Sequence, residues 1–266
     1  MTVSKRFDAK KFIIILATVL FVLVTMFCFV LLTTVKRVEV HFAVGDNTDT
    51  LAVQSVVDKN VGKNLLTIDE EEIKTSLSGF SYVEVVSVEK KFPNVVKVMV
   101  KERREIYGVE FDDKVHVLGE DGHLLKTVSK NNFEFTRDVI KLDLGAVKII
   151  EANVGQVLKT DSDELLTSVL DMTKSANLNN SIKEISVIKY AAAGELSDVE
   201  FVTYTGVKIC VYKAEEMGVE KMSAAFNVYD TQVSDYEKAT FTLYASYNFE
   251  KQRIEVTWSD RAVSEN

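Results

Sequence analysis

Three side chains, drawn from four candidates in this sequence, could together carry out nucleophilic catalysis. Cys210 could supply a thiol, and His116 or His123 could act as its base. Arg253 could then bind an oxyanion, which would complete a Cys/His transpeptidase. However, Cys210 lies in Val-Lys-Ile-Cys-Val, without the Thr-Leu-x-Thr-Cys approach that is typical of sortases. Because cysteine is among the most commonly buried residue types, we expect Cys210 to be a buried structural residue and not a catalytic nucleophile.

Signatures of other enzyme classes are absent from the sequence. It contains no Gly-x-Ser-x-Gly, His-Glu-x-x-His, Gly-x-x-x-x-Gly-Lys or Cys-x-x-Cys. The 3 histidines are scattered, and nothing singles out a carboxylate pair for glycan hydrolysis among 40 acidic residues. Glu70, Glu71 and Glu72 stand where a helix dipole favours negative charge in the first turn. We therefore expect no enzyme activity, no cofactor and no metal site.

The composition describes a folded and acidic protein. Of 266 residues, 47% are apolar and 27% are charged, which is enough for a substantial core. With 11 Gly and 1 Pro, the chain has no linker-like or low-complexity segment. A net charge of -8 argues against a surface for nucleic acid or anionic lipid, because both need an excess of basic residues, so either partner would require a local exception.

The N-terminal region has the pattern of a membrane anchor. From Phe12 to Leu32 only Thr18 and Thr25 carry a polar side chain. At about 1.5 Å per residue, a helix of this length spans a hydrocarbon core of roughly 30 Å. A cleaved signal peptide would have an apolar region of only about 7–15 residues, ending in small residues. We therefore predict an uncleaved transmembrane helix over residues 12–33, with Cys28 inside it and unable to pair with Cys210.

Basic residues set the expected orientation in the cell membrane. Four of them precede the apolar run, namely Lys5, Arg6, Lys10 and Lys11. This bias keeps residues 1–11 in the cytoplasm and places the remainder outside. An envelope sensor would therefore need a signalling partner, since so short a tail cannot hold a catalytic domain. That alternative, like a membrane-anchored extracytoplasmic enzyme, stays open at this point.

The region after the anchor predicts a small α+β domain over residues 35–105. A β-rich stretch runs from 35 to 42, and apolar spacing indicates a helix over 51–59. Thr67-Ile68-Asp69-Glu70 has the spacing of a capping box, and Ile73 and Leu77 behind it face a core. A hairpin follows, with strands over 82–90 and 96–101 around the turn Phe92-Pro93-Asn94. The predicted order is β-α-α-β-β.

A second domain, a mixed sheet with packed helices, is predicted over residues 106–260, and residues 261–266 form a polar tail. Its helices are expected over 163–176 and 215–229, from the spacing of their apolar residues. Its strands are expected over 107–111, 114–118, 123–128, 182–188, 199–204, 207–212, 239–246 and 253–258. The fold class is therefore α+β.

Two stretches resemble a known family. Residues 90–103, Lys-Lys-Phe-Pro-Asn-Val-Val-Lys-Val-Met-Val-Lys-Glu-Arg, combine a basic-aromatic-Pro turn, an alternating strand and a Glu-Arg pair. Residues 117–125, Val-Leu-Gly-Glu-Asp-Gly-His-Leu-Leu, form an acidic-Gly hairpin. Both are similar to the FtsQ/DivIB family of bacterial cell-division proteins. Glu105 departs from the pattern, because the family usually has proline there.

The resemblance implies a POTRA domain next to the membrane and a β domain that ends in an exposed strand. It implies a non-enzymatic scaffold at the division septum that holds single-pass partners of the FtsL and FtsB/DivIC types, and through them the septal peptidoglycan synthase. A partner strand would add to the C-terminal sheet edge. The partner-binding residues implied are Tyr247, from the loop before the last strand, and Arg253, Ile254, Val256 and Trp258.

Two other interpretations compete with this one. Alternation alone would bury Ile254, Val256 and Trp258 in the core, because the apolar face of a strand is normally the buried one. A POTRA-bearing outer-membrane translocator would need a closed barrel of many strands. The two helical patterns after residue 105 do not fit such a barrel.

Overall fold

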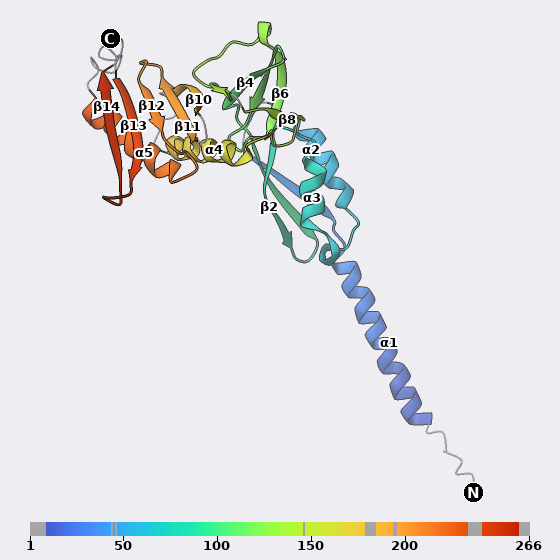
Figure 1. Cartoon of the computed structure of the whole chain (residues 1–266). Coiled ribbons are helices and arrows are strands. Elements are labelled where there is room, and N and C mark those ends of the chain that lie inside the picture. The colour runs from blue at the N-terminus through green and yellow to red at the C-terminus, as the bar shows by residue number, and fades with distance from the viewer. Residues whose placement is uncertain are drawn as a thin grey trace. The chain divides into compact units, whose positions relative to one another are not determined.

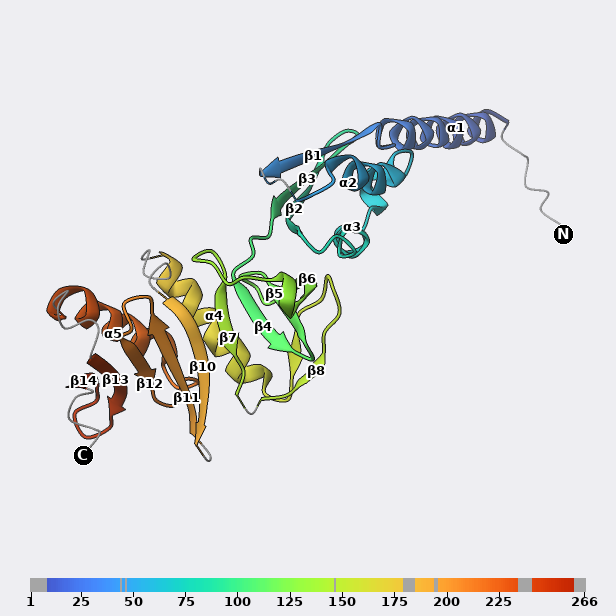
Figure 2. The same ribbon diagram turned by 90° about the horizontal axis from the view of Figure 1, so that it is seen from above.

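The computed structural model describes residues 9–43, 45, 47–145, 147–178, 185–193, 196–233 and 241–260 (Figures 1 and 2). The chain divides into two compact units, Met1–Glu102 and Arg103–Asn266. Helices and sheets occur in both, so the predicted α+β class is confirmed. The basic residues Lys5 and Arg6 and the expected tail 261–266 lie outside the described residues.

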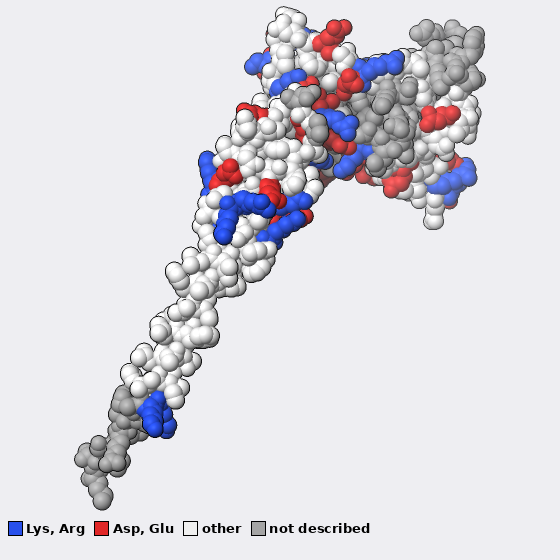
Figure 3. Space-filling view, turned by 180° about the vertical axis from the view of Figure 1, so that it is seen from behind, with Lys and Arg blue, Asp and Glu red and all other residues white. Residues whose placement is uncertain are grey.

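Helix α1 (Ala9–Leu32) is the predicted apolar helix. Its span Lys10–Leu32 has a mean hydropathy of 3.0 and is not buried by the rest of the protein. Figure 3 shows it free of charge along its length, with basic side chains at its start. Thr18 and Thr25 donate their hydroxyl protons to Ile14 O and Phe21 O, which satisfies both groups within the helix. These properties fit a single-pass membrane anchor.

The first unit has the predicted β-α-α-β-β order. Its sheet runs β1-β3-β2, with β1 parallel and β2 antiparallel to the central β3. Helices α2 and α3 contribute Val53, Val57, Ile73 and Leu77 to one core with the sheet. The bounds are β1 (Arg37–Ala43), α2 (Thr50–Val57), α3 (Glu70–Leu77), β2 (Val83–Lys91) and β3 (Val95–Glu102), with short 3-10 turns at Asp58–Asn60 and Leu65–Thr67.

The start of α3 differs from the predicted capping box. Asp69 is the N-cap, and its carboxylate accepts a hydrogen bond from Glu71 N at 2.9 Å. Thr67 instead closes a 3-10 turn and donates its hydroxyl to Asn64 O at 3.1 Å. The capping-box prediction is therefore wrong, because the preceding 3-10 turn moves the helix start by two residues. The acidic first turn and the buried Ile73 and Leu77 are confirmed.

The second unit is built on a nine-stranded sheet of order β14-β13-β12-β11-β10-β7-β4-β5-β6. Helices α4 (Asp163–Leu178) and α5 (Gly218–Gln232) share one core with it on the same side (Figure 2). The strands are β4 (Tyr107–Phe111), β5 (Lys114–Leu118), β6 (Leu124–Ser129), β7 (Ile140–Asp143), β10 (Ile185–Ala193), β11 (Leu196–Thr203), β12 (Lys208–Val211), β13 (Phe241–Asn248) and β14 (Arg253–Asp260).

Three short strands were not predicted. Strands β8 (Ile149–Glu151) and β9 (Lys159–Thr160) pair with each other apart from the main sheet. Strand β7 is more important, because it pairs in parallel with both β10 and β4. It therefore joins the two halves of the nine-stranded sheet. Four residues are too few for strand periodicity to be recognised.

Candidate functional site

The last strand lies at one edge of the sheet. Strand β14 pairs antiparallel with β13, and no other strand among the described residues pairs with it. Such an edge presents a row of backbone N–H and C=O groups to any incoming chain. The position of the strand at the edge, which alternation could not reveal, makes β14 the candidate interaction site.

The apolar residues of β14 are not all buried. Ile254, Val256 and Trp258 pair with Tyr247, Ala245 and Leu243, so they share the side of the sheet that the helices cover. Val256 packs against the core, and Ile254 is half-buried. Trp258 is 54% exposed. The interpretation that alternation buries all three is therefore wrong at Trp258.

Tyr247 belongs to a strand and not to a loop as expected. It lies in β13 opposite Ile254, because β13 extends to Asn248. Its ring packs edge-on against Phe249 at a centroid distance of 5.1 Å. Phe249 is 69% exposed at the turn and was not predicted as a site residue. The signal that could have found it is an aromatic residue within the polar segment Asn-Phe-Glu-Lys-Gln.

Arg253 is held by its own strand. Its Nη2 lies 3.1 Å from Glu255 Oε1, and Lys251 Nζ lies 2.8 Å from the same oxygen. Asn248 Nδ2 donates to the other carboxylate oxygen at 2.9 Å. Hydrogen bonds from Lys251, Asn248 and Arg253 lower the pKa of Glu255 to about 2. The end of the β13–β14 hairpin is thus fixed by a charged cluster in which Lys251 and Arg253 share the carboxylate of Glu255.

The other face of β14 continues a polar surface. Thr257 lies opposite Tyr244, which in turn lies opposite Cys210 on β12. The rings of Tyr244 and Tyr212 stack at a centroid distance of 5.9 Å. This face therefore offers aromatic and hydroxyl groups beside the open edge.

The groups that a Cys/His transpeptidase would need are not brought together. Cys210 on β12 and His116 on β5 are separated by five steps of the sheet order, about 24 Å at about 4.8 Å per step. Burial, followed by the nearby Glu200 carboxylate, raises the pKa of Cys210 to about 11. The side chain is therefore a neutral thiol near neutral pH and a poor nucleophile.

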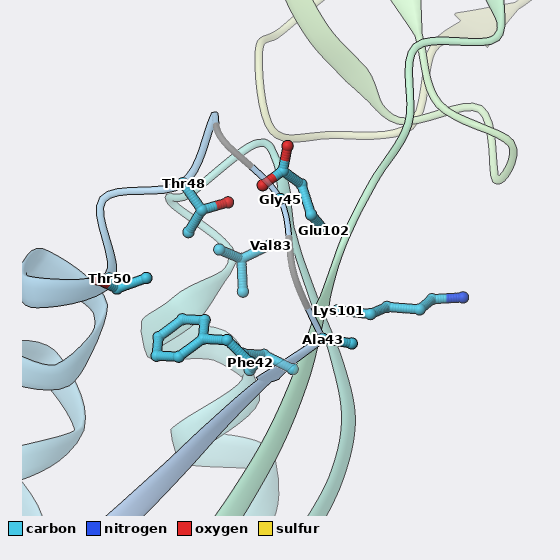
Figure 4. Close-up of a pocket in the computed structure, with 9 residues that line it drawn as sticks. Phe42, Ala43, Gly45, Thr48, Thr50, Val83, Lys101 and Glu102 are labelled. Carbon is cyan, nitrogen blue, oxygen red and sulfur yellow. The ribbon is translucent and has the colours of Figure 1, made fainter.

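A shallow pocket of about 190 Å³ lies at one end of the first unit (Figure 4). Glu102 stands at its rim and accepts hydrogen bonds from Asn47 N and Nδ2. The remaining lining is largely apolar, and the described residues contain no cluster that could hold a metal ion. We assign no chemistry to it. Its lining residues are Phe42, Ala43, Gly45, Thr48, Thr50, Val83, Val100, Lys101 and Glu102.

An ion pair connects the two sequence stretches that carry the family resemblance. Arg103 Nε lies 2.7 Å from Asp121 Oδ2, in the turn before β6. Gly122 completes that turn with a φ of 77°, a conformation that favours glycine. Glu105, which departs from the family pattern, pairs with Lys126 of β6 at 2.6 Å. The start of the second unit is thus attached to the β5–β6 hairpin.

Comparison with known proteins agrees with this architecture. The family model of the FtsQ-type POTRA domain matches residues 34–103. Cell division protein DivIB of Clostridium botulinum strain Hall is 23% identical over 183 residues, which cover 64% of this chain and 70% of that protein. DivIB of Clostridium tetani strain Massachusetts is 20% identical over 165 residues, covering 62% of this chain and 58% of the relative.

The chain also matches the solved structure of the major extracytoplasmic domain of DivIB from Geobacillus stearothermophilus. It is 18% identical and covers 50% of this chain and 98% of that one, with a TM-score of 0.30.

The fold and the anchor define a POTRA-bearing protein with a single apolar helix and a mixed β domain. This chain carries an FtsQ-type POTRA domain and is similar to DivIB cell-division proteins. Proteins of this family act in the divisome with other division proteins and are non-enzymatic scaffolds. The expectation that the chain is not an enzyme agrees with this similarity.

Proposed function

We propose that the chain is a bitopic scaffold that binds single-pass division proteins of the FtsL and FtsB/DivIC types at the β14 edge. In this scheme residues 1–11 are cytoplasmic, the POTRA domain (35–105) and the β domain (106–260) are extracytoplasmic, and the protein sits at the septum. It thereby positions the septal peptidoglycan synthase. The observation that carries the proposal is that β14, among the described residues, pairs with a strand on one side alone and bears a half-exposed tryptophan.

Strand addition explains how the edge would bind. A partner segment beside β14 would form main-chain hydrogen bonds about 4.8 Å away, which supply affinity independent of sequence. Its alternate side chains would then face the two sides of the sheet. On the helix side they meet Trp258 and Val256, and on the other side Thr257 and Glu255.

The side chains along the β14 edge indicate which residues a partner segment should have. Next to Trp258 we expect an apolar partner residue, because exposed aromatic anchors contribute most binding energy in interfaces. Arg253 and Lys251 share the single carboxylate of Glu255, so either of them could also contact a polar or acidic partner residue. Tyr247 and Phe249 extend the contact around the hairpin end.

The test uses the full chain and a matched aromatic variant. We expect Trp258→Ala to reduce co-purification of the single-pass partners by about tenfold or more, which corresponds to about 1.4 kcal/mol or more. The control is Phe111→Ala, since Phe111 is 42% exposed on β4, six strands away from β14 in the sheet order. Equal retention of the partners by both variants would reject the β14 edge as their binding site.

Localisation is tested separately. A fluorescent protein fused before Met1 is expected to form a septal band, and the same fusion lacking residues 247–266 is expected to lose its single-pass partners. A uniform membrane signal of the intact fusion throughout division would contradict the septal role. Retention of partners by the truncated chain would instead contradict only the edge site.

A further inference from the structure

The anchor helix joins the POTRA domain through a hydrogen-bonded junction. Helix α1 ends at Leu32, and the next residue, Thr33, is fully buried. Its N–H donates to Phe29 O at 3.0 Å, and its carbonyl accepts from Leu65 N at 2.7 Å. Asn64 Nδ2 also donates to the Thr33 hydroxyl oxygen at 2.9 Å. The last turn of the anchor is therefore built into the domain.

Two segments of the domain flank this junction. Val35 exchanges backbone hydrogen bonds with the loop after α2, donating to Lys63 O and accepting from Gly62 N, both at 2.9 Å. Lys36 N donates to Asn94 O, also at 2.9 Å, in the turn between β2 and β3. Since α1 is long enough to span a bilayer, both segments begin where the hydrocarbon ends.

The side chains of these segments form an amphipathic surface, which we call the collar. Its apolar members are strongly exposed: Val61 at 45%, Leu66 at 59% and Phe92 at 67%. Its basic members, Lys36 and Lys91, are exposed and form no ion pair within the described part of the chain. Figure 3 shows basic side chains gathered over the part of the domain from which the helix emerges.

Two acidic residues next to the collar have lysine partners of their own. Glu72 pairs with Lys63 at 3.2 Å, and Glu70 lies 4.0 Å from Lys90. Each carboxylate is thus matched by a lysine of its own. Lys36 and Lys91 remain available to an external anion.

We propose that the collar lies in the interfacial layer of the bilayer, with Val61, Leu66 and Phe92 at the acyl boundary and Lys36 and Lys91 on the phosphates of anionic phospholipids. Exposed apolar side chains and lysines combined in this way are typical of surfaces that bind membranes. The lysine stems can reach the phosphates while the apolar groups point into the lipid. The collar then holds the POTRA domain against the membrane. This role is additional to the proposed binding of partner proteins at the β14 edge.

The depth of the collar is measured on the full-length protein in lipid nanodiscs. A nitroxide is attached at Leu66→Cys or Phe92→Cys in a Cys28→Ser, Cys210→Ser background, and its accessibility to oxygen and to a water-soluble nickel chelate is compared. The matched control is Leu51→Cys. Leu51 is 81% exposed in the first turn of α2, which follows the far end of β1, about 20 Å along the strand.

In nanodiscs of phosphatidylglycerol and phosphatidylcholine we expect labels at 66 and 92 to favour oxygen over the chelate, and the label at 51 to favour the chelate. A label at 66 that is as accessible to the chelate as the one at 51 overturns the proposal. This outcome would leave the β14 edge untouched, so the two proposals fail separately.

The role of the lysines has its own test. Lys36→Gln with Lys91→Gln is expected to lower the ratio of lipid-exposed to aqueous label at 66 by about fivefold per lysine. Replacing phosphatidylglycerol by phosphatidylcholine should have the same effect, and Lys114→Gln in the second unit should have none. An unchanged ratio after both changes overturns the contact with anionic phosphate.

Discussion

Arg103 and Asp121 show how single residues support the fold of the second unit. The Asp121 carboxylate accepts a hydrogen bond from Arg103 Nε at 2.7 Å, and it lies 2.9 Å from His123 Nδ1. Burial alone would raise the pKa of Asp121, but the hydrogen bonds from His123 and Arg103 lower it well below its usual range. The carboxylate therefore stays charged, and its stabilising effect is lost only in strong acid.

The first prediction concerns this pair. Arg103→Gln should lower the free energy of unfolding of the second unit by about 1.5–3 kcal/mol, because it removes a hydrogen bond between charged groups. Urea unfolding followed by fluorescence measures this, since Trp258 is the only tryptophan and lies in that unit. Arg104→Gln is the control, because Arg104 is an exposed neighbour. Equal losses in both variants would contradict the role of the ion pair.

The second prediction concerns Glu255 and pH. Its pKa is lowered from 4.5 to about 2, first by the hydrogen bond from Lys251 and then by those from Asn248 and Arg253. The charged form is thus favoured in the fold, so its stabilisation is complete above pH 4.5 and is lost as pH falls through about 2.

An NMR titration of the Glu255 carboxyl carbon measures this midpoint. In Lys251→Ala the midpoint should move up towards 4.5. A midpoint near 4.5 in the unmodified protein would show that the cluster is not formed in solution.

Among the helices of the first unit, the residue at which a helix begins depends on which side chain can accept a hydrogen bond from the unpaired backbone N–H groups of the first turn. Asp49 caps α2 by accepting from Ala52 N at 3.0 Å, and Asp69 caps α3 in the same way through Glu71 N. Sequence spacing alone favoured Thr67 at the second site. The 3-10 turn Leu65–Thr67, capped by Asn64, removes Thr67 from the helix end.

The third prediction distinguishes the two caps. Asp69→Ala should lower the free energy of unfolding of the first unit by about 1 kcal/mol, since it leaves a helical N–H group without its acceptor. Thr67→Ala should change it by less than about 0.5 kcal/mol, as for other exposed sites. Thermal unfolding of the two variants in the same detergent gives the comparison. A larger loss for Thr67→Ala would restore the capping box.

At the scale of the whole molecule, the chain has two separate hydrophobic cores. One is formed by residues between Val35 and Val100, and the other by residues between Tyr107 and Ala245. Within the part of the chain that the structure describes, no residue belongs to both. Each unit therefore has the packing that a domain needs to unfold on its own.

The fourth prediction follows from these cores. Ile73→Ala and Leu243→Ala should each cost about 2–5 kcal/mol, because both side chains are fully buried. Ile73→Ala should leave the Trp258 fluorescence transition unchanged, while Leu243→Ala should lower its midpoint. Amide hydrogen exchange assigned by peptide mass gives the complementary map. A shift of the Trp258 transition in Ile73→Ala would show that the two units unfold together.

Features that depend on local pattern could be predicted from the sequence. The apolar run of α1, the β-α-α-β-β order and both long helices of the second unit follow from runs and spacings that span many residues. The conclusion that Cys210 is not a nucleophile also came from its immediate sequence, and the separation of β12 from β5 agrees with it.

Tertiary structure decided what depends on contacts between distant residues. Strand β7 joins the sheet through pairing with β4 and β10, which no pattern of four residues encodes. The edge position of β14 and the exposure of Trp258 depend on the order of all nine strands. Likewise, the two loops that carry Leu66 and Phe92 lie at the end of α1 because Thr33 and Lys36 form backbone hydrogen bonds with them. A periodic pattern specifies which face of a strand is apolar. Whether that face is buried depends on which other elements pack against it in the folded protein.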